Sequence, residues 1–409
     1  MGRLSLCMIV RNEQRMLPDF LASVAGIWDE LIVVDTGSED DTPRLAEAAG
    51  ARVLHHLWQD DFSAARNASL AAATGDWICY LDADERCTPE LAVQVRDLLE
   101  DPQAGAATVV MRNRRPDGTH RDADLLRLFR NDPDIRFRHR IHEDPSGHVQ
   151  AYLERTGLAM RRLTGVVDHL GYLKNVAAAQ GKRRRDTALL RRQVKGNPDD
   201  LYSWFKIMEQ ARYWEDRSAW RKAARGCRRR FEKADPADLA RQPWADELCA
   251  LLAQGLHNHP AQGLQWLDAL PEELRMGPAV QLRRGMWLEE VGRPDDAEAA
   301  YTACAAAGDR AGNDTQFGLR CGMGLCRLKA GAGDVPGAWD QAVRAGRACP
   351  SDPEALLAAV MFAPSDLARA DWLAGHLTAY PEAAPAVAET LKSCGLTDLA
   401  EALAATQLS

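Results

Sequence analysis

The chain has 409 residues, which is too long for one compact core and indicates two or three domains. Its composition, with 46% hydrophobic and 27% charged residues, is typical of a globular protein. No apolar run approaches the roughly 20 residues needed to span a bilayer, so we expect no membrane span. The net charge is −8 and no recognised nucleic-acid-binding motif accompanies the basic residues, so we expect no nucleic-acid partner.

The charge is unevenly distributed. Residues 112–195 hold 20 Lys and Arg against 10 Asp and Glu, so the middle of the chain is basic and the remainder is acidic. Such a tract is suited to a nucleotide diphosphate or an acidic partner, and it equally suits the solvated faces of Arg-rich helices. The second interpretation applies particularly to the run Lys182-Arg183-Arg184-Arg185.

The N-terminus begins with a short apolar run, Leu4–Val10, followed at once by Arg11-Asn12-Glu13. A signal peptide needs a longer apolar core and a small-residue cleavage site, so the run is expected to be a buried first strand. The ten cysteines contain no CxxC pair, which argues against a zinc cluster. Reduced thiols and a cytoplasmic location are therefore expected.

The first hundred residues alternate strand and helix signals. This alternation predicts a mostly parallel sheet covered by helices, in which ligands bind outside the carboxyl ends of the strands. The predicted strands are Leu4–Val10, Glu30–Val34, Ala51–His55 and Trp77–Leu81. The predicted helices are Met16–Val24, Pro43–Ala49 with Gly50 as its C-cap, and Ser63–Ala73.

Between Ala104 and Ala159 the pattern changes to short β-like pieces separated by turns such as Pro116-Asp117-Gly118. These pieces are expected to complete the sheet and to frame an acceptor cleft. They are Ala107–Arg112, Leu125–Arg130, Ile135–Ile141 and Gln150–Leu153, with Val166–Tyr172 as the last strand of the domain.

From about Asn175 onward the sequence predicts a nearly all-helical region, in which the pattern of residues repeats weakly about every 34 residues. Gly285, Ala297, Tyr301 and Cys304 occupy spacings at which tetratricopeptide (TPR) repeats place small, small, aromatic and small residues. Ala338, Ala345 and Pro350 fit the next repeat. The prediction is two regions, an α/β domain over residues 1–175 and an all-α helical-repeat domain over residues 176–409.

Two carboxylates, Asp82 and Asp84, flank one small residue directly after the buried run Trp77–Leu81. Hard divalent cations such as Mg²⁺ and Mn²⁺ prefer oxygen ligands and are often held by one or two carboxylates together with substrate phosphates. Surface turns also produce this spacing often. Its position at a strand end, beside other polar strand ends, favours a metal site.

Polar residues also follow the other predicted strands. Asp35 ends the second strand, where a carboxylate can accept hydrogen bonds from ribose hydroxyls or from a base N–H. Helix capping explains Ser38 or Asp41 well and Asp35 poorly. Asn12 follows the first strand and faces the same crevice. Arg66 lies in a helix whose N-terminus favours an anionic ligand, with a surface salt bridge as the alternative.

Four segments ending at Glu85 carry a family resemblance: SLCMIVRNE, LIVVDTGSEDDT, DDFSAARNASL and GDWICYLDADE. Their order and spacing resemble the N-terminal half of glycosyltransferase family 2. The later segments LFRN, RIHED and DHLGY resemble the subgroup that includes sublancin-type peptide S-glycosyltransferases and bacterial flagellin glycosyltransferases, which carry a helical, repeat-like tail. The resemblance covers residues 1–175 well and the tail only in kind.

The resemblance implies a Rossmann-like GT-A fold, a nucleotide-diphosphate sugar as donor substrate, and inversion at the anomeric carbon. It implies that Asp35 binds the nucleoside, with Asn12, Glu13 and Arg66 around it. Glycosyl transfer to a protein or peptide is then the expected activity, with flagellin among the acceptors.

The resemblance also implies a site for Mn²⁺ or Mg²⁺. Asp84 would be the main metal contact, Asp82 a ribose contact or a water-mediated metal contact, and His169 the third ligand. A buried structural role is the alternative for His169 and equally for His142.

An inverting transfer needs a general base for the acceptor nucleophile. The segment RIHED lies where related enzymes place an acidic residue at the acceptor cleft. Glu143 is the first candidate, and His142 and Asp144 are the others.

Alternative functions stay open at this stage. The acceptor is a carbohydrate or a lipid-linked sugar in one alternative, and in another the chain is a non-catalytic TPR scaffold with a decayed transferase domain. A nucleotidyltransferase is disfavoured because no Gly-rich, Lys/Arg-bearing phosphate loop lies near the N-terminus. The tail is expected to dock the acceptor or to form a homodimer.

Overall fold

The computed structural model describes residues 2–114, 120–171, 176–256, 260–311 and 315–406. It forms two compact units, Met1–Lys233 and Ala234–Ser409. Every element described after residue 175 is helical. The predicted turn at 116–118 and the predicted boundary at 175 lie outside the described residues, so the division of the chain at that point stays a prediction.

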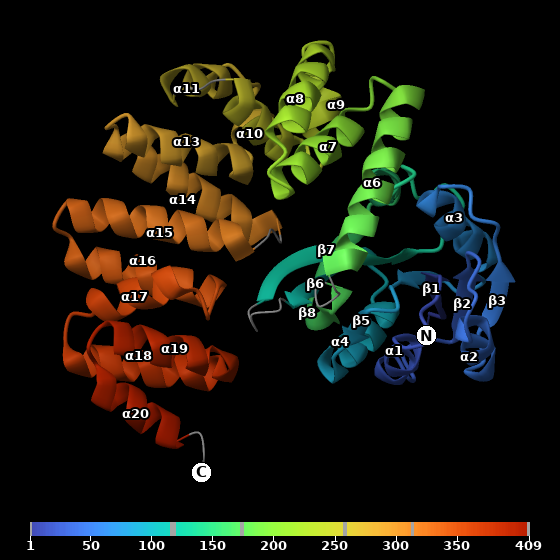
Figure 1. Ribbon diagram of the computed structural model, residues 1–409, viewed down its shortest axis with the longest axis horizontal. Coiled ribbons are helices and arrows are strands. Elements are labelled where there is room, and N and C mark those ends of the chain that lie inside the picture. The colour runs from blue at the N-terminus through green and yellow to red at the C-terminus, as the bar shows by residue number, and fades with distance from the viewer. Residues whose placement is uncertain (1, 115–119, 172–175, 257–259, 312–314, 407–409) are drawn as a thin grey trace. The chain divides into compact units, whose positions relative to one another are not determined.

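The first unit contains an eight-stranded sheet in the order β3-β2-β1-β4-β7-β6-β8-β5 (Figure 1). Four neighbouring strands in it are parallel: β3 (Arg52–His55), β2 (Glu30–Asp35), β1 (Leu4–Val10) and β4 (Trp77–Tyr80). Their bounds agree with the predicted strands to within one residue. Because they are parallel, their carboxyl ends, and the polar residues that follow them, lie at one edge of the sheet.

The other half of the sheet is mixed. β7 (His120–Arg130) pairs antiparallel with both β4 and β6 (Ala104–Arg114), and β8 (Ala159–His169) runs parallel to β6. The short strand β5 (Glu85–Cys87) pairs antiparallel with β8. This pairing brings the segment after Asp84 next to the end of β8, although about 85 residues of sequence separate them.

Helices cover both faces of the sheet, as the alternation of side chains along a strand requires. Leu4, Leu6 and Met8 of β1 point to one face and pack in one core, whereas Cys7 points to the other face and packs in a second core. The first face is covered by α1 (Leu17–Ser23), α2 (Thr42–Ala48) and α4 (Pro89–Glu100), and the second by α3 (Phe62–Ala72) and α5 (Ser146–Thr156).

Two predicted strands are wrong. Residues 135–141 form no strand, and their β-like composition reflects burial of Ile135, Phe137 and Ile141 in an irregular segment. Residues 150–153 lie inside α5, because Val149 and Leu153 are spaced four apart and bury one face of a helix that ends at Gly157, whose φ is +72°.

Three helices of the first unit follow the sheet: α6 (Val176–Gly196), α7 (Leu201–Tyr213) and α8 (Arg217–Phe231). Asp200 caps α7 by accepting a hydrogen bond from the backbone N–H of Tyr202, and Asp216 caps α8 in the same way through Ala219. Successive members of this group pack against each other. All three helices lie within the first compact unit, as the sheet does.

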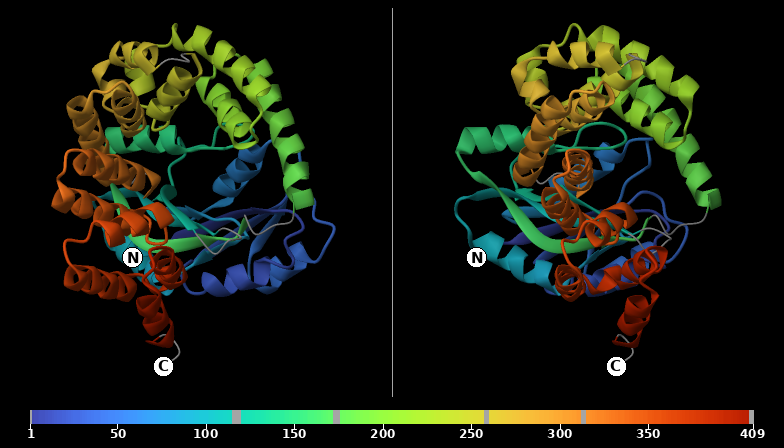
Figure 2. Two further views of the ribbon diagram at one scale, coloured as in Figure 1. Left: turned by 60° about the vertical axis from the view of Figure 1, so that its left-hand side comes forward. Right: turned by 90° about the vertical axis from the view of Figure 1, so that its left-hand side faces the viewer.

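The second unit is entirely helical over its described residues. Successive helices pack on their neighbours and form a stack, which can be followed in Figures 1 and 2. Its elements are α9 (Pro236–Ala240), α10 (Ala245–Leu256), α11 (Pro260–Asp268), α12 (Glu272–Arg275), α13 (Pro278–Glu290), α14 (Pro294–Ala311), α15 (Thr315–Gly331), α16 (Val335–Ala348), α17 (Pro353–Met361), α18 (Asp366–Ala379), η2 (Pro381–Ala383), α19 (Ala384–Ser393) and α20 (Thr397–Thr406).

The residues predicted from repeat spacing lie in the core of this stack. Tyr301 of α14 is fully buried between Gly285 of α13 and Gly324 of α15, where a Cβ atom would come within 2.6 Å and 2.5 Å of its ring. Small residues at these positions let neighbouring helices approach an aromatic ring closely. Ala297 and Cys304 are also fully buried, so the repeat-like packing is confirmed.

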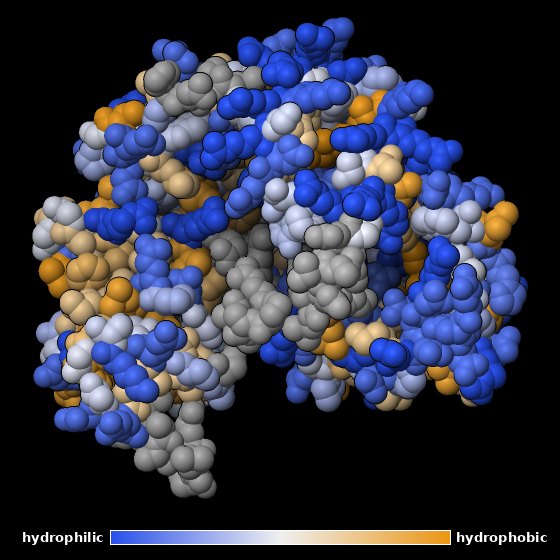
Figure 3. All heavy atoms as spheres, in the orientation of Figure 1, coloured by the Kyte–Doolittle hydropathy of each residue, from blue (hydrophilic) through white to orange (hydrophobic). Residues whose placement is uncertain are grey.

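The surface of the molecule shows no continuous apolar belt in the view of Figure 3. Polar residues dominate over α2 and β3, whereas the surface over α15 to α17 mixes apolar and polar residues (Figure 3). No helix within the described residues has both the length and the apolar character needed to cross a membrane.

Candidate functional site

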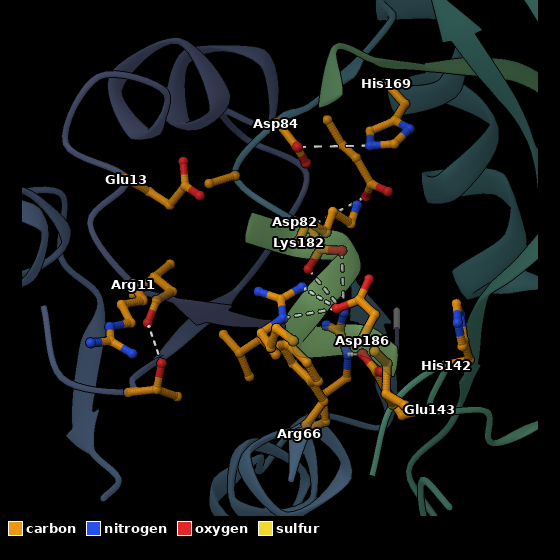
Figure 4. Close-up of a pocket in the computed structure, with 18 of the residues that line it drawn as sticks. Arg11, Glu13, Arg66, Asp82, Asp84, His142, Glu143, His169, Lys182 and Asp186 are labelled. Atoms are coloured by element: carbon orange, nitrogen blue, oxygen red, sulfur yellow. Dashed lines mark hydrogen bonds and ion pairs between the residues drawn. The ribbon is translucent and has the colours of Figure 1, made fainter. Parts of the chain in front are cut away.

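A pocket of about 490 Å³ opens at the carboxyl edge of β1, β2 and β4. Its walls come from the strand ends, from β6, β7 and β8, from residues 141–143, and from α6 (Figure 4). It is lined by Ile9, Val10, Arg11, Glu13, Thr36, Trp58, Phe62, Arg66, Asp82, Ala83, Asp84, Glu85, Met111, Asn113, Leu125, Arg127, Ile141, His142, Glu143, His169, Lys182, Arg185 and Asp186. Most of the predicted site residues therefore gather in one place.

Asp84 and His169 face each other across one end of the pocket (Figure 4). Oδ2 of Asp84 lies 3.7 Å from Nε2 of His169. The other ring nitrogen, Nδ1, lies 2.9 Å from Oδ1 of Asn113, a contact that orients the ring. With the proton on Nδ1, the Nε2 lone pair is directed toward Asp84, which is the tautomer that a metal ligand requires.

Gly171 keeps the space between these two side chains open. A Cβ atom at this position would lie 2.5 Å from Nε2 of His169 and 2.8 Å from Oδ2 of Asp84. One carboxylate oxygen and one imidazole nitrogen thus border a volume that any side chain at residue 171 would fill. This donor set fits Mn²⁺ or Mg²⁺ bound jointly with phosphate oxygens, since such ions need only one or two protein ligands there.

Arg66 lies at the centre of the pocket wall and joins two acidic residues. Its Nη2 is 2.9 Å from Oδ1 of Asp82, and its Nε is 2.8 Å from Oε1 of Glu143. Burial opposes the charged guanidinium, but the carboxylates of Asp82 and Glu143 outweigh it and raise the pKa of Arg66. The surface salt bridge considered for Arg66 is excluded, because its side chain is only 8% exposed.

A second, deeper ion pair supports the same wall. Glu85 is buried, lies 2.8 Å from Nη2 of Arg127, and accepts a hydrogen bond from the backbone N–H of Asp82. Burial raises the pKa of the Glu85 carboxyl against the opposing effect of Arg127. Arg127 also stacks over the ring of Tyr80 at 4.8 Å. This pair fixes the backbone on which Asp82 and Asp84 are carried.

Of the residues at the strand ends that were predicted to bind the nucleoside, one lines the pocket and two do not. Glu13 lines the pocket, whereas Asn12 and Asp35 do not. Asp35 is 4% exposed, and its carboxylate accepts hydrogen bonds from the backbone N–H groups of Gly37 and Ser38 at 3.2 Å and 3.1 Å.

Asn12 has a matching role in the same turn. Its φ is +57°, its Oδ1 accepts from the backbone N–H of Glu39, and its own N–H donates to Oγ of Ser38. Asn12 and Asp35 therefore hold the turn after β2. That turn contributes Thr36 to the pocket.

The three candidates for a base have different surroundings. Glu143 lines the pocket, and within the described part of the chain its Oε2 has no hydrogen-bond partner, whereas Oε1 is held by Arg66. His142 lines the same pocket, and burial of the ring together with the charge of Lys206 lowers its pKa. Asp144 does not line the pocket, because its Oδ1 accepts hydrogen bonds from the N–H and Oγ of Ser146 at the start of α5.

Several lining residues were not predicted from the sequence as parts of the site. They include Asn113, Arg127, Lys182, Arg185 and Asp186. Gly171, which borders the space between Asp84 and His169, was not predicted either. Glu85 had a local signal, as the third acidic residue of the segment Asp82–Glu85. The others come together only through strand pairing and through the packing of α6, which no local pattern shows.

Comparison with known proteins shows which families the two parts of the chain resemble. Residues 5–154 match the family model for glycosyl transferase family 2. A TPR repeat-containing protein of Synechococcus elongatus is 44% identical over 209 residues, which cover 51% of this chain and 52% of that protein. The SPbeta prophage-derived glycosyltransferase SunS of Bacillus subtilis is 26% identical over 195 residues, 47% of this chain and 45% of that protein.

Among solved structures, S. aureus TarS (residues 1–349) in complex with UDP-GlcNAc aligns with a TM-score of 0.36 and 14% identity, covering 84% of this chain and 91% of that one. The chain spans about half the length of the two curated relatives. Residues 5–154 thus resemble glycosyl transferase family 2, and a helical, repeat-like region follows the sheet.

Proposed function

We propose that this chain is an inverting, metal-dependent glycosyltransferase that moves a sugar from a nucleotide-diphosphate sugar to a protein or peptide. One observation carries the proposal. The pocket of a family 2 domain places the facing pair Asp84 and His169 at one end and an acidic side chain, Glu143, on the wall held by Arg66. A donor held between them would have its leaving group near the first pair and its anomeric carbon toward the second.

The facing pair would hold Mn²⁺ or Mg²⁺. Asp84 supplies an oxygen and His169 a nitrogen, and Gly171 leaves the room between them. Asp82 would act through water or on the ribose, since both of its oxygens face Arg66. When bound, the cation supplies Lewis-acid stabilisation of the charge that develops on the departing diphosphate.

Glu143 would act as the general base. Its Oε2 would take the proton from the acceptor O–H or S–H as the lone pair of that atom attacks the anomeric carbon. The bond from this carbon to the phosphate oxygen breaks, and its electron pair leaves with the nucleoside diphosphate. Arg66 holds Oε1 and so fixes the direction of Oε2. Attack from the face opposite the leaving group inverts the anomeric configuration.

The donor nucleoside would lie against the ends of β1 and β2. Arg11, Glu13 and Thr36 line that side of the pocket. Asp35 and Asn12 would contribute by holding the turn that carries Thr36, and a direct contact of Asp35 with the nucleoside would require rearrangement of its hydrogen bonds to Gly37 and Ser38.

A polypeptide is the proposed acceptor because of two features. The segments LFRN, RIHED and DHLGY resemble peptide and flagellin glycosyltransferases, and helical-repeat stacks commonly bind polypeptides. A homodimer through the second unit would use the same surface. A carbohydrate or lipid-linked acceptor is the alternative, and a decayed scaffold is disfavoured by the complete set of charged residues in the pocket.

Mass spectrometry of intact acceptors tests this proposal. The full chain is incubated with Mn²⁺, a panel of nucleotide sugars and the polypeptides encoded beside it, and Glu143→Gln serves as the transfer-deficient control. A sugar-sized mass increase on a polypeptide with the wild type alone is expected. Transfer only to oligosaccharide or lipid-linked acceptors would contradict the polypeptide assignment, and consumption of no donor would contradict the enzyme assignment.

A further inference from the structure

Residues 138–144, here called the acid loop, carry Glu143 and are held by helices that lie beyond the matched family region. The backbone N–H of Arg140 donates to Oε1 of Gln193 in α6 at 2.6 Å. The hydroxyl of Tyr202 in α7 donates to the carbonyl oxygen of His142 at 3.0 Å. The acid loop thus donates a hydrogen bond to α6 on one side of Ile141 and accepts one from α7 on the other side.

The backbone of the acid loop needs such support. His139 and His142 have φ angles of +72° and +55°, in the left-handed region that residues other than glycine seldom adopt. Strained residues persist where the surroundings determine their conformation, and they cluster at functional sites. Here the surroundings are α6 and α7: Asp200 lies 3.2 Å from Nδ1 of His139, and the ring of Tyr202 packs on the ring of His139 at 4.5 Å.

Apolar packing adds a third attachment between the two strained residues. Ile141 is 4% exposed and packs against Leu189 and Leu190 of α6. Phe62 of α3 and Ile207 of α7 border the same cluster. Ile141, two residues before Glu143, is therefore anchored against the helices.

The same helix also forms part of the pocket wall. Lys182, Arg185 and Asp186 of α6 line the pocket beside Glu143 (Figure 4). Arg185 is fixed by its ion pair with the buried Asp186 at 2.8 Å and by stacking over Phe62 at 5.1 Å. Lys182 and Arg185 thus border the pocket while staying exposed to solvent, so this run is more than a solvated helix face.

We propose that α6 and α7 contribute to the active site by holding the acid loop, and that Tyr202 is the residue that positions Glu143. Tyr202 holds the carbonyl oxygen of His142, the residue before Glu143, and so sets the direction in which the Glu143 side chain points from the acid loop. Gln193 of α6 also holds the acid loop, by accepting a hydrogen bond from the backbone N–H of Arg140. This inference rests on the proposed function, because it assigns a partner to the proposed base.

The hydroxyl of Tyr202 is suited to this role. Burial raises its pKa, so the hydroxyl keeps its proton and stays a donor at any physiological pH. It donates to a backbone carbonyl, and replacing the tyrosine by phenylalanine removes this bond while leaving the ring on His139 in place. The substitution therefore separates positioning of the acid loop from its packing.

The test compares Tyr202→Phe with Tyr213→Phe in the full chain. Tyr213 ends the same helix and is 68% exposed, so its variant is a matched control. For the nucleotide sugar that the wild type turns over, Tyr202→Phe should lower kcat for hydrolysis about tenfold at unchanged KM, because misplacing a reacting group by 1 Å costs up to about 10²-fold. Gln193→Ala should give the same pattern.

Two further measurements make the outcome decisive. Hydrogen exchange should quicken at the amides of residues 138–144 in Tyr202→Phe and not in Tyr213→Phe. In a Glu143→Gln background, Tyr202→Phe should cause no additional loss, since it acts through that carboxylate. Wild-type kcat and exchange in Tyr202→Phe would overturn the positioning role alone. Full turnover in Glu143→Gln would instead overturn the base assignment and, with it, this inference.

Discussion

Gly171→Ala is the substitution that probes the space between Asp84 and His169 most directly. The added methyl group would lie 2.5 Å from Nε2 of His169 and 2.8 Å from Oδ2 of Asp84. Ordinary contacts between non-bonded heavy atoms are about 3.5–4.0 Å, so the ring and the carboxylate must each retreat by about 1 Å. The methyl group also occupies the volume that a bound cation would need.

The expected loss in function is much larger than the loss in stability. Overpacking costs about 1–3 kcal/mol of unfolding free energy, and both neighbours are side-chain ends that can move. Changes next to metal ligands lower metal affinity by about 10–100-fold, and Gly171→Ala acts on the ligands themselves, so a Mn²⁺ titration in the presence of a nucleoside diphosphate should show at least that loss. Donor turnover should fall with it.

Gly147→Ala provides the matched control. This glycine lies in the first turn of α5, and an added Cβ would meet nothing within 4 Å. The control should keep wild-type Mn²⁺ affinity, turnover and thermal stability. Wild-type Mn²⁺ affinity and turnover in Gly171→Ala would refute the assignment of a cation to this space.

Three other predictions concern the turn after β2, the extent of the catalytic unit and the repeat core. Asp35→Ala should cost about 1–3 kcal/mol in a thermal unfolding experiment and weaken nucleoside diphosphate binding through the disordered turn; unchanged stability and affinity would contradict this role. A fragment of residues 1–233 should hydrolyse the donor, whereas a fragment of residues 1–175 should not, because the shorter fragment lacks the helices that hold the acid loop. Equal activity of both fragments would contradict the need for these helices. Gly285→Ala should destabilise the second unit by about 1–3 kcal/mol through its clash with Tyr301 and leave donor hydrolysis unchanged, as separate unfolding and activity measurements would show.

The parallel half of the sheet could be predicted from sequence because its signals are local. β1, β2 and β4 contain short apolar runs, and a polar residue lies at the end of each strand or within two residues after it. Parallel pairing then places those polar residues at one edge of the sheet. Asp82 and Asp84 could be assigned to the site for this reason, before any contact between distant segments was known.

The contacts between site residues from distant segments could not be predicted in this way. Arg66 and Glu143 are 77 residues apart in sequence, and Asn113 and His169 are 56 apart. Each pair forms because β-strand pairing or loop packing brings distant segments together, and no periodicity in the sequence records it. Gly171 likewise has a role only once the positions of its neighbours are known.

The segment before α5 shows where composition misleads. Residues 135–141 largely alternate apolar and polar side chains, as a half-buried strand does, and Ile135, Phe137 and Ile141 are indeed buried. They form a loop because His139 adopts a positive φ and because the backbone of Arg140 bonds to Gln193 rather than to a neighbouring strand. Tertiary contacts with α6 and α7 decide this conformation.

The central claim is most directly tested by donor consumption in the presence of Mn²⁺. Release of nucleoside diphosphate from a panel of nucleotide sugars is measured for the wild type, for Asp84→Ala, and for Asp97→Ala on the exposed side of α4 as control. We predict that one donor is consumed, that activity falls by about 10²–10³ in Asp84→Ala, and that chelation by EDTA has the same effect. Full activity of Asp84→Ala, or of the wild type in EDTA, would contradict the account.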